Sequence, residues 1–208
     1  MRAILVKEHG SPEDMILEDL PTPKPGPGEV LIDIHAIGLN FSDLLVINGQ
    51  YQSLPPLPFV PGMEAAGLVS AVGEGVSHRK PGDRVMARLN YGAYAEQAIA
   101  QELNCFVIPE SMSFSQAAAM GIVYQTAHFA LIERAQYAPG ETVLVNGASG
   151  GVGLAAVQLA KISRLLPAVV TATAPEGFDA SDHGLLSVAA AHVMAYETGA
   201  ADALERVT

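Results

Sequence analysis

The segment from Val143 to Gly153 constrains the fold of this chain more than any other. Four residues suited to a buried strand, Val143 to Asn146, lead into a turn of small residues. An apolar helical run, Val152 to Ile162, follows directly. A strand that turns through glycines into a helix leaves backbone N–H groups without partners, and these donors and the helix dipole suit a pyrophosphate.

The turn matches the G-x-G-x-x-G pattern of dinucleotide-binding folds, with alanine in the first place. Ala148, Gly150 and Gly153 occupy the three pattern positions. Gly150 would let the backbone approach the phosphates, and Gly153 would let helix and strand pack closely. The predicted cofactor-binding residues of this turn are Ala148, Ser149, Gly150, Gly151, Val152 and Gly153. A tight strand–helix connection without a ligand is the alternative interpretation.

Composition excludes several classes of partner. The net charge of −11 combines 11 basic with 22 acidic residues, and no Lys or Arg lies between Leu165 and Glu205. Nucleic acid and anionic membranes, which need clustered basic residues, are therefore poor partners. No apolar stretch reaches the roughly 18–20 residues of a membrane span, and we expect no signal peptide because the apolar part of the N-terminus is too short for one. We expect a cytoplasmic protein whose one cysteine, Cys105, forms no intrachain disulfide.

Residues 1–112 are predicted to form a mainly β domain. Short strands alternate with Gly and Pro turns, which is typical of a compact barrel. The expected strands are Arg2–Val6, Val30–Ile37, Ala65–Val72, Arg84–Ala87, Ala93–Ala100 and Cys105–Ile108.

Residues 113–208 are predicted to form an α/β domain. Ser113 and Gln116 have the spacing of a capping box, and a second helical run covers Tyr124–Ala135. From Thr142 the pattern is βαβαβ, with later strands at Ala168–Ala172 and His192–Ala195. This is half of a doubly wound nucleotide-binding fold, so we expect the chain to be the first part of a longer enzyme.

Several segments together resemble a known family. They are Gly38–Asp43 with Gly49–Tyr51, Pro61–Gly67, Gly73–Val76 with Gly82–Val85, Gly92–Glu96, Gln116–Ala119 and Gly147–Gly153. Their order and spacing resemble the zinc-independent quinone oxidoreductase (zeta-crystallin-like) branch of the medium-chain dehydrogenase/reductase superfamily. The resemblance implies a GroES-like barrel domain, a partial Rossmann domain and bound NADPH. It also implies hydride transfer to a quinone or an α,β-unsaturated carbonyl, and a homodimer as a further expectation.

The positions that bind catalytic zinc in related enzymes carry other residues here. Asn40 stands where the zinc-dependent relatives have Cys, and Met63 where they have His. An amide and a thioether are not usual zinc ligands. The relatives also insert a four-cysteine lobe where only Met86–Tyr91 separate two matching segments. We therefore expect no metal.

Without a metal, hydrogen-bond donors must stabilise the negative charge that develops on the substrate oxygen. Asn40 Nδ2 and the Tyr51 O–H are the candidate catalytic donors, and Asn40 is also a candidate cofactor contact. Asn40 has an alternative role as the cap of a helix over Phe41–Val46, and Tyr51 as an exposed loop aromatic.

Three further polar or reactive residues have structural interpretations. Asp43 in the first helical turn favours the helix dipole. Glu64 lies in an apolar run and is expected to pair with Arg84 or Arg88, because an unpaired buried charge is costly. Cys105 is expected to be a buried strand residue rather than a nucleophile.

The resemblance places further cofactor contacts on two elements. Tyr124 and Thr126 match the helix that faces the nicotinamide, although ordinary helix packing is the alternative. Thr171, Thr173 and Tyr196 follow the second and third strands, where NADPH enzymes hold the 2′-phosphate. No acid stands at Ala172–Ala174, which argues against NAD, but the Lys common in the family is missing.

Two other functions remain open. A non-catalytic nucleotide-binding or structural relative would bind NADPH without turnover. An enoyl-thioester reductase of the same superfamily would need a wide cleft for a pantetheine arm.

Overall fold

The computed structural model describes residues 1–138, 143–162 and 168–171. The chain forms two compact units, Met1–Ile122 (unit 1) and Val123–Thr208 (unit 2). The expected domain boundary after residue 112 remains a prediction. The predicted helix and strand at about 180–195 lie outside the described residues.

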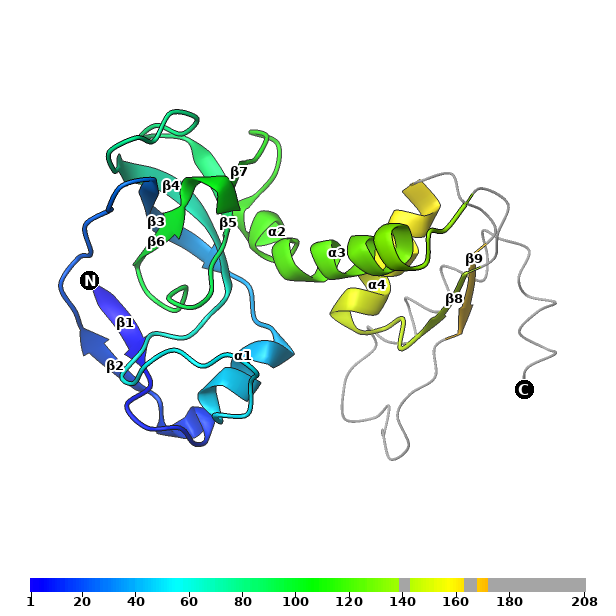
Figure 1. Ribbon diagram of the computed structural model, residues 1–208, viewed down its shortest axis with the longest axis horizontal. Helices are drawn as coiled ribbons and strands as arrows, with labels where there is room; N and C mark the ends of the chain where they lie inside the picture. Colours follow the sequence, from blue (N-terminus) through cyan, green and yellow to red (C-terminus); the bar gives the residue numbers. More distant parts are fainter. Residues whose placement is uncertain (139–142, 163–167, 172–208) are drawn as a thin grey trace. The chain divides into compact units, whose positions relative to one another are not determined.

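A five-stranded antiparallel sheet forms the framework of unit 1 (Figure 1). In spatial order its strands are β6 (Gln97–Gln101), β3 (Glu29–Ile37), β4 (Glu64–Val72), β5 (Arg84–Arg88) and β7 (Cys105–Val107). The pairing of β3 with β4 shifts register twice, and such bulges bend a strand pair. The residues of one face, among them Val30, Ile32, Val69 and Val85, are buried together in the core.

A two-stranded hairpin of β1 (Arg2–Leu5) and β2 (Ile16–Asp19) joins this sheet through backbone hydrogen bonds. Ile4 N–H donates to Tyr94 O at 2.8 Å, and Glu96 N–H donates to Arg2 O at 3.0 Å. These bonds explain why the strand predicted at Ala93–Ala100 begins only at Gln97. Strand β2 was not predicted, because three of its four residues are exposed and it lacks an apolar pattern.

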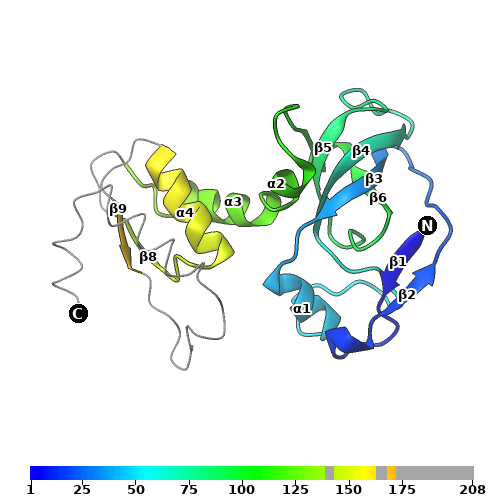
Figure 2. The same ribbon diagram turned by 180° about the vertical axis from the view of Figure 1, so that it is seen from behind.

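The helices of unit 1 lie between strands or after them. They are α1 (Phe41–Ile47), α2 (Phe114–Ala118) and the start of α3 (Gly121–His128), with short 3₁₀ turns at Pro12–Asp14 and Glu102–Asn104. The predicted capping box at the start of α2 is confirmed, since Gln116 N–H donates to Ser113 Oγ at 3.1 Å. Helix α2 packs on the outer face of the sheet, against β3, β4 and β5 (Figure 2).

Unit 2 continues from α3 into a π-helical turn, Phe129–Arg134, in which Ala135 N–H donates to Ala130 O at 2.9 Å. Strand β8 (Val143–Asn146), helix α4 (Gly151–Ile162) and parallel strand β9 (Ala168–Thr171) then form the predicted βαβ unit. No helix among the described residues is long and apolar enough to cross a membrane.

Candidate functional site

The glycine-rich turn joins β8 to α4 as the sequence predicts. Gly147 has a φ of 68°, in the left-handed region that a residue with a Cβ rarely adopts. Gly150 N–H donates to Gly147 O at 3.0 Å and closes the turn. Ser149, Gly150 and Gly151 are exposed to solvent, so the outer side of the turn is accessible.

The start of α4 presents backbone donors. Leu154 N–H donates to Gly150 O at 2.8 Å and is the first to bond into the helix. Within the described ranges, the N–H groups of Gly151, Val152 and Gly153 have no hydrogen-bond partner. These donors lie at the positive end of the helix dipole, so the turn is suited to hold a phosphate.

The two later glycines of the pattern differ in what surrounds them. A Cβ on Gly153 would lie 2.3 Å from Gly147 O, so only glycine allows this close approach of helix and turn. A Cβ on Gly150 would lie 3.4 Å from the same oxygen, at ordinary contact distance. Packing therefore requires Gly153, whereas a Cβ at position 150 would make only an ordinary contact. Ala148 is buried against Val145 and Val157, as a core residue.

Of the two candidate residues on α3, Tyr124 is half-buried and Thr126 is exposed. The Tyr124 hydroxyl donates to Gln158 Oε1 on α4. A Cβ on Gly151 would lie 3.1 Å from Val123 Cγ1, so α3 also lies close to the start of α4. The Tyr124 hydroxyl is thus used in the contact between α3 and α4. The nicotinamide contacts of Tyr124 and Thr126 stay predictions.

Strand β9 brings Thr171 to the same sheet edge as the glycine-rich turn. Thr171 ends β9 and pairs in register with Asn146, the last residue of β8. The carboxyl ends of parallel strands are where nucleotides bind in such sheets. Thr173 and Tyr196 lie outside the described residues.

In unit 1, Asn40 is the N-cap of α1, which confirms the capping interpretation. Its N–H donates to Asp43 Oδ2 at 2.9 Å, and its side chain faces the N–H of Asp43. Its Nδ2 donates to Glu64 Oε1 at 2.7 Å. The amide is therefore held through Nδ2, and one Nδ2 hydrogen has no partner among the described residues.

Glu64 is buried, with 2 % of its surface exposed. The predicted ion pair of its carboxylate with Arg84 or Arg88 is wrong. Its Oε2 accepts the N–H of Ile122 at 2.7 Å, and a second backbone hydrogen bond comes from Gly121. Arg84 instead donates to Met112 O at 2.6 Å and lies over the ring of Phe114. Backbone and amide donors thus replace the expected cation.

Asp43 is a second buried carboxylate, also 2 % exposed. The Tyr94 hydroxyl donates to its Oδ2 at 3.0 Å, beside the bond from Asn40 N–H. Its Oδ1 is buried without a hydrogen-bond partner in the described part of the chain. Asp43 is structural, as predicted, but its burial and its bond from Tyr94 were not foreseen.

Burial controls the titration of this cluster. Desolvation raises the pKa of Asp43, although hydrogen bonds from Asn40 and Tyr94 oppose the shift. Desolvation likewise raises the pKa of Glu64, and the charge of Asp43 raises it further. The pKa of Tyr94 is raised by burial and by the two carboxylates, so its hydroxyl stays protonated.

Tyr51 is half-buried and packs with Met63 against a cluster that contains Ile47 and Phe59. The alternative interpretation as an exposed loop aromatic is therefore wrong, while the catalytic role stays a prediction. Met63 accepts a hydrogen bond from Ser42 Oγ at 3.4 Å. Met63 thus packs against the same cluster as Tyr51, and the next residue, Glu64, accepts a hydrogen bond from Asn40.

No group of three metal-ligating side chains occurs in the part of the chain that the structure describes. Cys105 is buried in β7, as predicted, and burial raises the pKa of its thiol to about 12. The thiol is therefore neither ionised nor accessible as a nucleophile at neutral pH.

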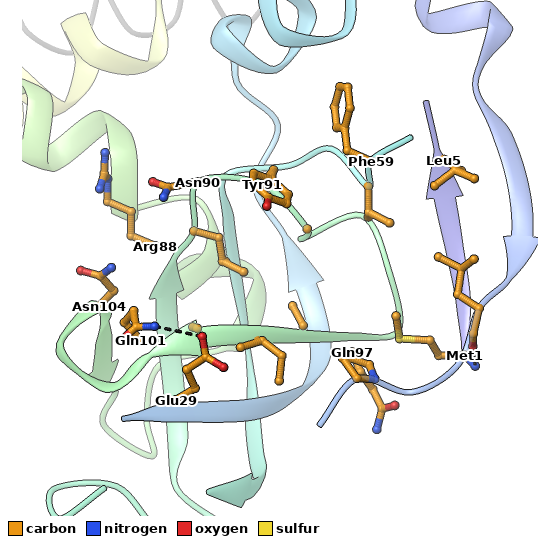
Figure 3. Close-up of a pocket in the computed structure, with 18 of the residues that line it drawn as sticks. Met1, Leu5, Glu29, Phe59, Arg88, Asn90, Tyr91, Gln97, Gln101 and Asn104 are labelled. Carbon is orange, nitrogen blue, oxygen red and sulfur yellow. Dashed lines mark hydrogen bonds between the residues drawn. The ribbon is translucent and has the colours of Figure 1, made fainter. Parts of the chain in front are cut away.

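A pocket of about 620 Å³ lies elsewhere in unit 1, between β1, β6 and the loop that follows β5 (Figure 3). Met1, Leu5, Phe59 and Tyr91 contribute apolar surface, and neither Asn40 nor Tyr51 lines it. This pocket is separate from the site predicted around Asn40.

Comparison with known proteins connects these features to a family. Residues 26–110 match the model of the alcohol dehydrogenase GroES-like domain. The chain is 42 % identical over 187 residues to the human synaptic vesicle membrane protein VAT-1 homolog, covering 89 % of this chain and 48 % of that protein. It is 46 % identical over 163 residues to human quinone oxidoreductase, covering 77 % and 50 %.

A solved structure of the quinone oxidoreductase from Thermus thermophilus, described together with its NADPH complex, has a TM-score of 0.73 to this chain. The two are 35 % identical over 91 % of this chain and 57 % of that one. The chain belongs to the medium-chain dehydrogenase/reductase superfamily, in the branch of the quinone oxidoreductases and VAT-1 homologs. It spans about half the length of the members of this branch that it matches.

Within this branch, the sheet of unit 1 is the GroES-like domain, and the βαβ unit has the arrangement of a Rossmann domain. Sequence reasoning found both regions. It missed the link from Asn40 to Glu64 and from Tyr94 to Asp43. An acid at Glu64 within an apolar run was the signal that a buried donor must exist, but its source was not visible.

Proposed function

We propose that this chain carries the machinery of a zinc-free oxidoreductase that uses NADPH to reduce a quinone or an α,β-unsaturated carbonyl. The observation that carries the proposal is the accessible start of α4, where three consecutive backbone N–H groups have no partner within the described ranges. The quinone oxidoreductase relatives, one of them described in complex with NADPH, support the same function.

The residues present at the turn fit a dinucleotide. The N–H groups of Gly151, Val152 and Gly153 would hold the diphosphate, and the exposed backbone of Gly150 would let it approach. Ala148 and Ser149 complete the turn, with Ala148 as its buried anchor. Tyr124 and Thr126 would lie along the nicotinamide.

The adenosine end of the coenzyme would contact residues after β9. Thr171, Thr173 and Tyr196 are the proposed donors to the 2′-phosphate. With no Lys or Arg between Leu165 and Glu205, they would bind it through neutral hydrogen bonds, which are weaker than bonds from a charged donor.

NADPH, when bound, supplies a hydride. The task of the protein is to orient the reactants and to stabilise the negative charge that appears on the substrate oxygen. The free Nδ2 hydrogen of Asn40 is a donor for that oxygen, and the hydroxyl of Tyr51 is a second. The proton that completes the product would come from the Tyr51 hydroxyl or from solvent.

Nucleotide binding is the first test. NADPH and NADH are titrated by fluorescence into the 208-residue chain and into the variants Gly150→Asp and Ala130→Asp. Position 130 is exposed in the same unit, so its variant adds the same charge away from the turn. Wild type and A130D should bind NADPH alike, and G150D about tenfold or more weakly, because like-charge juxtaposition costs several kcal/mol.

Turnover is the second test, with a panel of quinones, enones and enoyl thioesters. Reduction of a quinone or enone by NADPH supports the proposal. Saturable binding without turnover identifies a nucleotide-binding relative, and preferential reduction of thioesters identifies an enoyl-thioester reductase. Failure to bind either nucleotide overturns the proposal.

A further inference from the structure

The carboxylate of Glu64 lies in a space built for it. A Cβ on Gly38 would lie 2.3 Å from Glu64 Oε1, and a Cβ on Gly121 would lie 2.6 Å from Glu64 Oε2. Two glycines from distant parts of the chain thus flank the carboxylate, and any side chain at either position would displace it. Such a close fit fixes the position of both oxygens.

In the part of the chain that the structure describes, every hydrogen-bond partner of the Glu64 carboxylate is a donor. Asn40 Nδ2 donates to Oε1, and the backbone N–H groups of Gly121 and Ile122 hold the other side. An ionised carboxylate only accepts hydrogen bonds, so it satisfies all three at once. The same property leaves Asn40 one orientation, with its NH₂ group toward Glu64.

We propose that Glu64 is a positioning residue, whose buried carboxylate holds the amide of Asn40 so that one Nδ2 hydrogen stays available for the substrate oxygen. This inference rests on the proposed function, in which Asn40 is the donor to that oxygen. Glu64 itself touches neither substrate nor coenzyme in this proposal.

Glutamine at position 64 has nearly the same size as glutamate but would reverse the direction of the hydrogen bond with Asn40. A glutamine side chain has one acceptor oxygen and one donor NH₂ group. Two backbone donors from α3 favour the oxygen on their side, so the NH₂ group would point at Asn40. The Asn40 amide must then turn its oxygen toward position 64, which moves its NH₂ group away from the place that it holds in the wild type.

The experiment compares Glu64→Gln with the matched control Glu110→Gln, which removes the same charge from an exposed residue. We expect E64Q to lower kcat for quinone or enone reduction by roughly 10- to 100-fold, since misplacement of a reacting group costs about that much. NADPH affinity should change less than about twofold, because the turn of unit 2, where the charged diphosphate binds, is intact. E110Q should leave both values unchanged.

A pair of exchanged residues separates positioning from folding. Asn40→Asp alone places a half-buried carboxylate at hydrogen-bond distance from the buried carboxylate of Glu64 and should lower Tm strongly. In the double variant N40D/E64Q, the introduced glutamine amide donates to the new carboxylate at position 40. The hydrogen bond is then restored with reversed polarity, and Asp is a good N-cap. Tm should recover toward wild type, while kcat stays low because position 40 has no donor. Recovery of both Tm and kcat would overturn the proposal.

A spectroscopic readout keeps the proposal testable if no substrate is turned over. The side-chain NH₂ signals of Asn40 in a ¹H–¹⁵N spectrum are assigned by their loss in N40D/E64Q. One of the two protons should be shifted downfield by its bond to the carboxylate in wild type and E110Q, and not in E64Q. Unchanged Asn40 signals in E64Q would refute the positioning role, whereas absent turnover with the expected shift would refute only the proposed function.

Discussion

The glycine-rich turn of unit 2 and the carboxylate cluster of unit 1 both present hydrogen-bond donors, but they are built in opposite ways. The turn uses backbone N–H groups of consecutive residues, Gly151 to Gly153, and leaves them accessible. The cluster around Asp43 and Glu64 uses side chains and backbone from four separate segments of the chain. Most of its carboxylate oxygens accept hydrogen bonds inside the protein. One region leaves its donors without partners in the described part of the chain, and the other satisfies its carboxylates within the protein.

The difference has an energetic origin. Exposed N–H groups bond to water, so leaving them unpaired costs little until an anion replaces the water. Buried carboxylates have no such alternative, and each must be satisfied within the protein. Substitutions in the turn should therefore separate binding from stability, whereas substitutions in the cluster should affect stability directly.

The largest expected effect breaks the turn itself. Gly153→Ala places a Cβ 2.3 Å from Gly147 O, so helix and turn must move apart, and we expect a loss of about 3 kcal/mol in unfolding free energy. Gly150→Ala, with 3.4 Å to the same atom, should change stability by less than about 1 kcal/mol. Denaturant unfolding measures both. Equal losses would show that close helix packing does not distinguish the two glycines.

A smaller effect is expected from Tyr94→Phe, which removes the hydroxyl that donates to Asp43 Oδ2. The buried Asp43 carboxylate would lose this donor without gaining another, so the free energy of unfolding should fall by about 1–3 kcal/mol. Tyr91→Phe is the control, because Tyr91 is exposed and its hydroxyl has no partner among the described residues. A stability of Y94F equal to that of Y91F would contradict the importance of this bond.

The pH dependence of stability sharpens the comparison further. Because desolvation raises the pKa of Asp43 above its ordinary value of 3.8, the folded protein binds its proton more tightly than the unfolded chain. Its contribution to stability is therefore full below that ordinary value and is lost as pH rises through the folded-state pKa.

Asp43→Asn should remove this pH-dependent loss of stability. The Tm of D43N minus the Tm of the wild type should therefore increase as pH rises from about 4 upward. Thermal unfolding between about pH 4 and pH 8 measures it. Asp19→Asn, an exposed acid, provides the control and should show no such trend. A difference that is constant with pH would argue that Asp43 is ionised in both states alike.

The smallest effect should come from metal removal. Asn40 and Met63 offer an amide and a thioether, which are not usual zinc ligands, so dialysis against a chelator should leave Tm and any reductase activity unchanged. Elemental analysis of the purified chain before and after dialysis checks that metal was absent or removed. A chelator-dependent loss of turnover would show that a metal takes part in the reaction.

The amino-acid sequence determined the features that depend on neighbours along the chain. The strand–turn–helix of Val143 to Ile162, the cap at Asn40 and the capping box at Ser113 follow from backbone sterics and local hydrogen bonding. Most strands of unit 1 were also predicted from apolar runs between Gly and Pro turns. The π-helical turn at Phe129–Arg134 carries no such local signal, and it was missed.

Only the tertiary structure decided which groups donate hydrogen bonds to the buried carboxylates. The partners of Glu64 lie 24 and 58 residues away in sequence, at Asn40 and Ile122, and Tyr94 lies 51 residues from Asp43. A sequence shows that an acid in an apolar run needs compensation, and a cation is the obvious candidate. Three neutral donors can do the same when folding brings them to one point, and no local pattern records that convergence.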